Sequence, residues 1–254
     1  MPEHVELPET LREVHVLIPY EIRDGREVSP EYDTPGFRAQ LQRWFDVLNL
    51  SWTWHPVTLG NARAVVAGIS RLPDGSATVL NLCDGNEVDG YPGLTVTRAL
   101  EESGIAFTGA GSHFYSNTNS KLRMKDLLSA GGVTTPGYEC IADAACDVRR
   151  AGARLGYPLI VKPVFSAACF GICHGSVVHD DASAMAQVAR LRSGLHGCRF
   201  AEVFVEHFVI GREFTVLVTG AADRHHGIRV YPPAERAFDP GLPPELRFLT
   251  YERY

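Results

Sequence analysis

Apolar residues in the first part of the chain occur in two alternating patterns. Two continuous apolar runs have the length and the β-branched content of buried strands. Between and after them, apolar positions recur at helical spacing, and Asp33 or Thr34 can cap the first helix. Strands that alternate with helices predict a parallel α/β unit. The expected strands are residues 14–19, 77–83 and 105–108, and the expected helices run through residues 37–48 and 94–103.

The pattern changes after the glycine-rich residues 109–112, which we take as a boundary. A helix is expected at 121–130 with a cap at Asn119 or Ser116, because Gly131-Gly132 ends the apolar pattern there. Beyond it, two short apolar runs flank a loop of small residues, which predicts antiparallel strands. The remaining expected helices are 142–155 and one capped by Asp181, and the expected strands are 159–161, 172–178, 201–205 and 213–218.

Composition narrows the class of protein. The 254 residues are 45% hydrophobic, carry a formal net charge of -6 and contain no basic run. We therefore expect neither a nucleic-acid partner nor a membrane partner. The acidic N-terminus has no apolar stretch of signal-peptide length, which predicts a cytoplasmic protein with reduced cysteines. No Cys or His spacing indicates a metal site.

Four charged residues can carry chemistry. Lys162 follows a strand, and the loop behind it has small residues whose N–H groups can approach an anion. Glu206 and Glu213 stand at strand ends around Phe208 and Val209, where a carboxylate can accept two hydroxyl groups. Lys121 lies in the first turn of a helix, where the helix dipole offers a cation no stabilisation. Taken singly, each has an ordinary alternative as a snorkelling lysine, a solvated strand end or a surface ion pair.

The order of these motifs resembles the ATP-grasp superfamily, and within it most closely the D-alanine–D-alanine ligases. The resemblance begins near Asn81 and runs to the end of the chain. It rests on Lys121 with the following GVTTP, on LIVKP at 159–163, on the small-residue loop, and on VEHFVIGREFTV at 205–216. It also includes GIAFTGAG at 104–111, while residues 25–29 are a fainter echo of the family's first glycine-rich turn.

The resemblance implies a fold and a division into domains. We expect an α/β protein that becomes α+β in its second half, with a Rossmann-like N-terminal domain followed by an incomplete ATP-grasp fold. The expected parts are an N-terminal domain at 1–111, a central ATP-grasp subdomain at 112–204 and the beginning of the C-terminal subdomain at 205–254. Family members are often dimers through the N-terminal domain, so a homodimer is allowed.

The resemblance also implies roles for individual residues. Lys121 and Lys162 would hold the phosphates of ATP, Glu206 with Phe208 and Val209 the adenine, and Glu213 the ribose. A lid over the phosphates would be formed by Ser166, Ala167, Ala168, Cys169 and Gly171. Small amino-acid or carboxylate substrates would react through an acyl phosphate, with Mg²⁺ bridging the phosphate oxygens.

The sequence departs from the family in several places. Ala168 and Cys169 stand where the family has two serines, Gly25 stands where its first turn has an acidic residue, and Cys83-Asp84-Gly85 replaces a His-Gly near the first substrate. An acidic residue there repels a substrate carboxylate, which argues against D-alanine. The family's Mg²⁺ ligands and catalytic arginine come from later strands that we do not find. Arg253 is the candidate to replace a phosphate-facing lysine.

Three interpretations follow. The leading one is an ATP-dependent carboxylate–amine ligase, present as a fragment without its metal site. The second is a non-catalytic or degenerate ATP-binding module. A carboxylase component ranks lowest, because carboxylases usually carry a longer glycine-rich lid than residues 166–171 provide.

Overall fold

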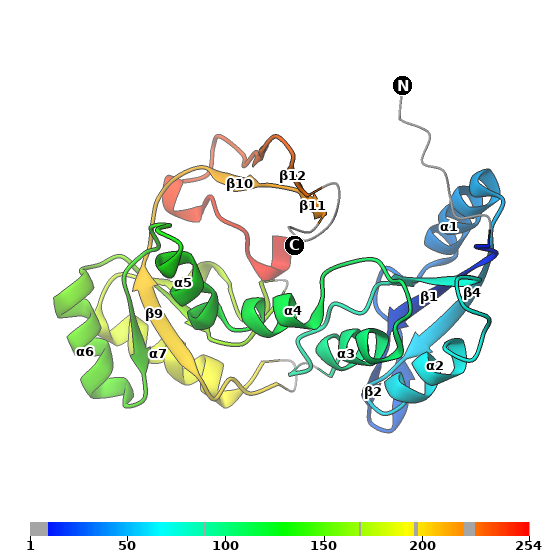
Figure 1. The fold of residues 1–254 in the computed structure, drawn as a ribbon. Coiled ribbons are helices and arrows are strands. Elements are labelled where there is room, and N and C mark those ends of the chain that lie inside the picture. The colour runs from blue at the N-terminus through cyan, green and yellow to red at the C-terminus, as the bar shows by residue number, and fades with distance from the viewer. Residues whose placement is uncertain (1–9, 89, 168, 196–197, 221–226, 254) are drawn as a thin grey trace. The chain divides into compact units, whose positions relative to one another are not determined.

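A computed structural model describes residues 10–88, 90–167, 169–195, 198–220 and 227–253. The chain forms two compact units (Figure 1). Unit 1 comprises Met1–Ala130 with Phe165–Ala167, and unit 2 comprises Gly131–Val164 with Ala168–Tyr254. In the described part of the chain, no helix combines the length and the apolar character that crossing a bilayer requires.

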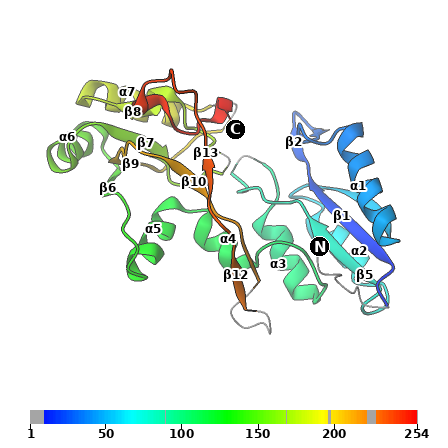
Figure 2. The same cartoon turned by 90° about the horizontal axis from the view of Figure 1, so that it is seen from above.

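Unit 1 is built on a parallel sheet of three strands in the order β4-β1-β5. The strands are β1 (Glu13–Pro19), β4 (Ser51–Val57) and β5 (Ala77–Asn81). Side chains alternate along β1, so Val16 packs toward α1 (Pro35–Leu48) while Leu17 packs against α2 (Ala62–Ile69) and α3 (Leu94–Ser103). Helices therefore cover both faces of the sheet, as Figure 2 shows.

Most of the predicted elements of unit 1 are confirmed. The strand at β1 and the helices α1 and α3 lie where the apolar pattern indicates, and the Thr34 hydroxyl caps α1 by accepting from the Phe37 N–H at 3.2 Å. The strand β4 and the helix α2 were not predicted. The expected strand at 105–108 is reduced to a single parallel bridge, between Phe107 and Val79 of β5.

The stretch that contains residues 25–29 lies in and just after a hairpin of β2 (Glu21–Arg23) and β3 (Arg26–Val28). The echo of the family's first glycine-rich turn stays a prediction. The two turn residues of the hairpin, Asp24 and Gly25, have φ of 52° and 73°, respectively. Positive φ at both central positions is the requirement of a type I′ turn, for which Asp-Gly is a favoured pair.

Two further helices complete unit 1. The helix α4 (Ser112–Thr118) occupies the stretch after the glycine-rich boundary, and α5 (Lys121–Ala130) has the predicted bounds. The expected caps at Ser116 and Asn119 are wrong, since the Ser120 hydroxyl accepts from the Arg123 N–H at 3.3 Å. Both helices belong to unit 1, whereas the sequence placed residues 112–130 with the central subdomain. The division into subdomains stays a prediction.

Unit 2 contains an antiparallel sheet in the order β6-β9-β7-β8. The strands are β6 (Tyr138–Ile141), β7 (Leu159–Pro163), β8 (Val177–Val178) and β9 (Val203–His207). Two helices, α6 (Ala144–Leu155) and α7 (Asp181–Ser193), bury one of its faces. The core of this layer includes Val161 and Val205 of the strands together with Val148 and Leu191 of the helices.

Several boundaries in unit 2 differ from those predicted. The returning strand expected at 172–178 is reduced to β8, because His174–Ser176 form a 3-10 turn. The cap of α7 is Asp180 instead of Asp181, with the Asp180 carboxylate accepting from the Ser183 N–H at 2.7 Å. The helix α6 starts two residues late because the unpredicted strand β6 precedes it, and Asp143 is its cap.

The described residues from Glu213 onward form two small ladders and a returning segment. The expected strand at 213–218 is split into β10 (Glu213–Thr215), which pairs with β13 (Ala234–Arg236), and β11 (Val218–Gly220), which pairs with β12 (Ile228–Val230). Between the 3-10 turns at Pro244–Leu246 and Tyr251–Arg253, the chain returns to the sheet. There the ring of Phe248 packs with Ile160, Ile172 and Phe208.

Two histidines face each other inside unit 1. The His15 Nδ1 and His55 Nε2 atoms are 2.9 Å apart, and the ring centroids are separated by 5.1 Å. Burial lowers the pKa of both side chains, and for His55 the neighbouring His15 adds to the effect. One ring donates and the other accepts in this bond, which a doubly protonated pair cannot do.

We expect unit 1 to lose stability as the pH falls below about 6.5, the ordinary histidine pKa. The folded pKa values are lowered, so the unfolded chain binds more protons and acid favours it, by up to about 1.4 kcal/mol per pH unit for each histidine. All three tryptophans (44, 52 and 54) lie in unit 1, so denaturant unfolding followed by their fluorescence reports on this unit.

The matched variant is His15→Asn with His55→Gln, since the amide groups occupy the positions of Nδ1 and Nε2. Its unfolding free energy should change less between pH 7 and pH 5 than that of the wild-type chain. Equal pH dependence in the two proteins would contradict the assignment.

Candidate active site

The register of β7 against β9 places two opposite charges on one face of the unit 2 sheet. Ile160 is paired with Glu206, and Lys162 with Phe204. Glu206 and Lys162 are therefore diagonal neighbours, a relation that long side chains can span. The intervening Val161 and its partner Val205 point to the opposite face and pack against the helices.

These two side chains form an ion pair shielded from solvent. The Lys162 Nζ atom donates to the Glu206 Oε1 atom at 2.5 Å. The Glu206 side chain is 8% exposed and that of Lys162 is 23% exposed. Because so little water reaches the pair, screening is weak and the loss of either partner leaves a costly uncompensated charge.

The pair lies in the wall of a cavity of about 420 Å³. This volume is within the range of about 300–1,000 Å³ that is usual for small-molecule sites. Its apolar wall includes the buried rings of Phe208 and Phe248, whose centroids are 5.4 Å apart. Of the sequence-predicted site residues, the cavity brings together Lys162, Cys169, Glu206, Phe208, Val209 and Glu213.

Backbone hydrogen bonding stops just after β9, at the wall of the cavity. The His207 N–H donates to the Gly137 carbonyl and the Phe208 N–H to the Pro158 carbonyl, each at 3.0 Å. Within the described ranges, the Val209 N–H has no hydrogen-bond partner. A main-chain donor at the edge of an apolar cavity suits the recognition of a flat heteroaromatic base.

Glu213 begins β10 and joins this strand to the returning segment. One of its carboxylate oxygens accepts from the Leu249 N–H at 3.2 Å. An ionised carboxylate has further acceptor sites, so the group can bind a ligand hydroxyl while it holds Leu249. The neighbouring Arg212 is paired with Glu235, with nitrogen–oxygen distances of 2.8 and 2.5 Å.

The segment expected to form the lid is anchored at its first residue. Ser166 is buried, and the Lys121 Nζ atom donates to its carbonyl oxygen at 2.7 Å and to its Oγ atom at 2.6 Å. Lys121, Ser166 and Ala167 belong to unit 1. The contact gives Lys121 a structural role that the sequence did not predict.

The rest of the expected lid belongs to unit 2 or is outside the described residues. Ala168 is outside them. Cys169 has φ of 58° and borders the cavity, while its carbonyl accepts from the Ile172 N–H at 2.9 Å. Gly171 has φ of 86°, and a Cβ atom there would lie 2.7 Å from Pro163 Cγ, so a larger residue does not fit.

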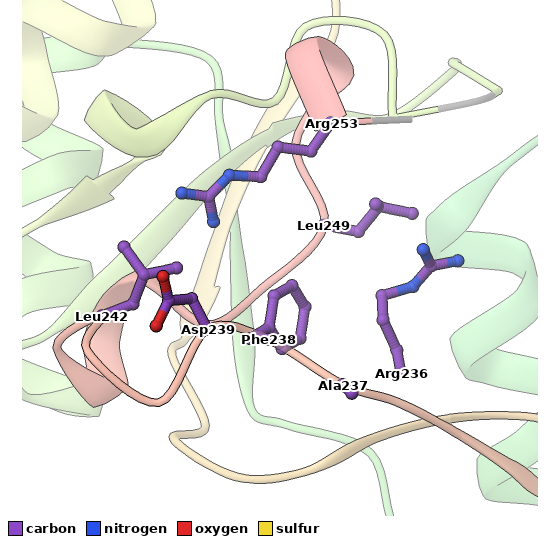
Figure 3. Close-up of a pocket in the computed structure, with 7 residues that line it drawn as sticks. All are labelled: Arg236, Ala237, Phe238, Asp239, Leu242, Leu249 and Arg253. Carbon is purple, nitrogen blue, oxygen red and sulfur yellow. The ribbon is translucent and has the colours of Figure 1, made fainter.

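Arg253, the candidate to replace a phosphate-facing lysine, lines a different cavity, of about 450 Å³. Figure 3 shows Arg253 and Arg236 on either side of the Phe238 ring. The Arg253 Nη1 atom donates to the Leu246 carbonyl at 2.9 Å. Leu249 borders both cavities, so the segment that carries it separates Arg253 from the Lys162–Glu206 pair.

A second polar group lies after β5 in unit 1. Asp84 is reached by solvent, yet desolvation by the surrounding protein raises the pKa of its carboxyl group. Burial and the negative charge of Asp84 also raise the pKa of the Tyr32 and Tyr115 hydroxyl groups, which therefore stay protonated. The sequence drew attention to Asp84 alone, because the two tyrosines come from distant segments.

The cavity residues that the sequence did not predict include Phe248 and Arg247, which reach the wall from the returning segment, and Pro136, which precedes β6. No local pattern marks them. Phe248 and Arg247 reach the cavity only because the segment that carries them returns to the sheet, where Leu249 bonds to Glu213 across 36 positions of the chain. Such long-range contacts have no sequence period.

Solved structures of other proteins share the fold of this chain. No family model matches the chain. The biotin carboxylase domain of Hydrogenobacter thermophilus 2-oxoglutarate carboxylase, a structure with MgADP, has a TM-score of 0.64 at 14% identity. The match covers 90% of this chain and 51% of that one. The chain thus has a mixed α/β fold of the kind found in ATP-grasp enzymes.

The more particular likeness is to D-alanine–D-alanine ligases. The enzyme of Bordetella petrii is 33% identical over 136 residues, which are 54% of this chain and 39% of that protein. The ligase of Bacillus anthracis, a structure complexed with ATP, has a TM-score of 0.52 at 18% identity, covering 87% of this chain and 70% of that one. The predicted resemblance is confirmed, and the chain spans about two fifths of the curated relative's length.

We expect the Lys121 contact to hold the segment around Ser166 in place. Lys121→Met removes the donor for both the Ser166 carbonyl and its hydroxyl, and leaving a buried acceptor without a partner costs about 1–3 kcal/mol. Amide hydrogen exchange of residues 165–167 should therefore become faster.

Arg123→Met is the matched control, because Arg123 is an exposed cation on the same helix. It should leave the exchange of residues 165–167 unchanged. Unaltered exchange in Lys121→Met would show that the contact does not order this segment.

Proposed function

We propose that this chain provides the nucleotide-binding part of an ATP-dependent carboxylate–amine ligase of the D-alanine–D-alanine ligase type. The observation that carries the proposal is the unit 2 cavity, which is lined by Lys162, Glu206, Phe208, Val209 and Glu213. The resemblance implies a contact with one nucleotide for each of these residues. In the same proposal, the parallel unit 1 corresponds to the Rossmann-like N-terminal domain.

The chemistry of the cavity fits the parts of a nucleoside phosphate. A cation is present for a phosphate, aromatic rings and a main-chain donor for a base, and a carboxylate with spare acceptor sites for ribose hydroxyls. Lys162 would contact a phosphate, Phe208 and the Val209 backbone the base, and Glu213 the ribose. Lys121 keeps the role that the resemblance gives it, as a second cation toward the phosphates.

The remaining assignments rest on the resemblance. The residues at 166–171 would cover the phosphates, with main-chain N–H groups in place of the absent serine hydroxyls. Arg253 would replace a phosphate-facing lysine. In the described residues, no three His, Cys, Asp or Glu side chains gather as a metal-ligand group.

The proposed reaction forms an amide bond. ATP supplies the phosphoryl group that activates a substrate carboxylate, and an amine then displaces phosphate. The protein contributes by holding the reactants in position and by placing positive charge around the phosphates. Asp84 argues for a first substrate other than D-alanine, because its carboxylate disfavours a substrate carboxylate beside it.

We expect this chain to bind ATP, and two substitutions should remove different parts of the binding energy. Lys162→Met should weaken ATP and ADP by about tenfold or more, because a charge-assisted hydrogen bond is worth about 1.5–3 kcal/mol, while adenosine is unaffected. Glu213→Gln should weaken ATP, ADP and adenosine alike. Isothermal titration calorimetry with the three ligands provides the measurement.

Glu235→Gln is the matched control, since Glu235 is an exposed carboxylate whose partner Arg212 borders the cavity. It should leave all three affinities unchanged. Failure of the wild-type chain to bind any of the ligands would refute the proposal, and amine-dependent ADP release over a panel of amino acids extends the test from binding to catalysis.

A further inference from the structure

The cavity beside Arg253 combines three charged side chains with an apolar lining. Its volume is about 450 Å³, and the charged residues are Arg236, Asp239 and Arg253. We propose that this cavity binds an acidic amino acid, whose two carboxylates are held by the two arginines and whose ammonium group is held by Asp239. The site belongs to unit 2 alone and requires no nucleotide, so it stands independently of the proposed function.

The charges of the cavity determine which ligand fits. A plain dicarboxylate would be attracted by the arginines but repelled by Asp239. A neutral amino acid has one carboxylate, so it would leave one arginine without a partner. A ligand with two carboxylates and one ammonium group complements all three side chains. The acidic amino acids have this combination of groups.

The two arginines provide separate positions for the carboxylates. In the view of Figure 3, the Arg236 and Arg253 guanidinium groups lie on opposite sides of the Phe238 ring. Arg236 is exposed, and its guanidinium group has no hydrogen bond or ion pair within the described ranges. The Arg253 Nη1 atom donates to the Leu246 carbonyl at 2.9 Å, which uses one of five N–H donors. Each group can therefore bind a carboxylate through two donors, and Arg253 keeps others for the phosphate that the resemblance gives it.

Asp239 has a carboxylate oxygen to offer to the ligand. Its Oδ1 atom accepts from the Gly241 N–H at 2.7 Å, which fixes the side chain. In the part of the chain that the structure describes, it forms no ion pair with Arg236 or Arg253, although all three line one cavity. The second oxygen can therefore accept from an ammonium group of the ligand.

Both carboxylates next to Arg236 on the small ladder have other partners. The strand β13 places Arg236 opposite Glu213, whose carboxylate accepts from the Leu249 N–H. The preceding residue, Glu235, points to the other face of the ladder and is paired with Arg212. The Arg236 guanidinium group is thus held at the cavity wall without being neutralised by its neighbours.

The loop that carries Asp239 is held in shape from outside the cavity. Arg247 donates from Nε to the Leu242 carbonyl and from Nη2 to the Pro240 carbonyl, each at 2.7 Å. The Leu242 N–H in turn donates to the Asp239 carbonyl at 3.0 Å. Because the loop is ordered before a ligand arrives, binding does not have to supply the free energy of ordering it.

Isothermal titration calorimetry without nucleotide tests the site with ligands that each lack one group. The acidic amino acids are aspartate and glutamate, each in both configurations. Succinate and glutarate lack the ammonium group, while β-alanine and γ-aminobutyrate lack one carboxylate. We expect the best acidic amino acid to bind about tenfold more tightly than its two analogues, a ratio that corresponds to about 1.4 kcal/mol.

Two substitutions should reproduce these deletions from the side of the protein. Arg236→Gln should weaken the acidic amino acid by about tenfold but the one-carboxylate analogue by less, because a single carboxylate can still bind Arg253. Asp239→Asn should weaken the acidic amino acid by a similar factor and should not weaken the dicarboxylate. The amide oxygen of Asn can still accept from the Gly241 N–H, so the loop keeps its shape.

Arg229→Gln and Glu235→Gln are the matched controls, because both residues are exposed on the small ladders and lie outside the cavity lining. They should leave every affinity unchanged. The inference would be overturned if the wild-type chain bound neither acidic amino acid. It would also be overturned if Asp239→Asn weakened the dicarboxylates as much as the amino acids. Titration of the same protein with ATP decides the proposed function separately, and neither result determines the other.

Discussion

The antiparallel register between β7 and β9 is the constraint on which the candidate site depends. Side chains alternate along both strands, so Val161 and Val205 face the helices while Lys162 and Glu206 face the cavity. A slip of one residue in either strand would move a charge into the helix-packed core and an apolar side chain into the cavity. The buried valines thus hold the two charges in place, although they never contact a ligand.

Much of this could be predicted from the sequence, because the signals are local. An apolar run that ends in a lysine before a proline predicts both the strand β7 and the position of Lys162 at its end. The run around 203–206 gives the same information about Glu206, although the strand extends to His207. The helices α3 and α5 have their predicted bounds since a glycine follows each of their apolar patterns, at Gly104 and Gly131.

What the sequence missed depends on contacts between distant segments. The strand β4 was overlooked because its alternation includes two tryptophans and a proline instead of a smooth apolar run. The anchoring of Ser166 by Lys121 joins residues 45 positions apart. Leu249 reaches Glu213 across 36 positions, and this bond is what brings the returning segment to the cavity. No periodicity encodes such pairings, which arise from the packing of complete elements.

The ion pair itself argues for function over stability. Its surroundings on the cavity face are apolar, since Ile160, Phe208 and Phe248 pack together beside it. Replacing a shielded ion pair by apolar side chains of similar volume is often neutral or stabilising, because the desolvation of two charges offsets much of their attraction. A fold selected for stability alone would therefore extend the apolar cluster across positions 162 and 206. The pair places a fixed positive charge at the wall of a cavity, and binding an anion there is the property that an apolar replacement would remove.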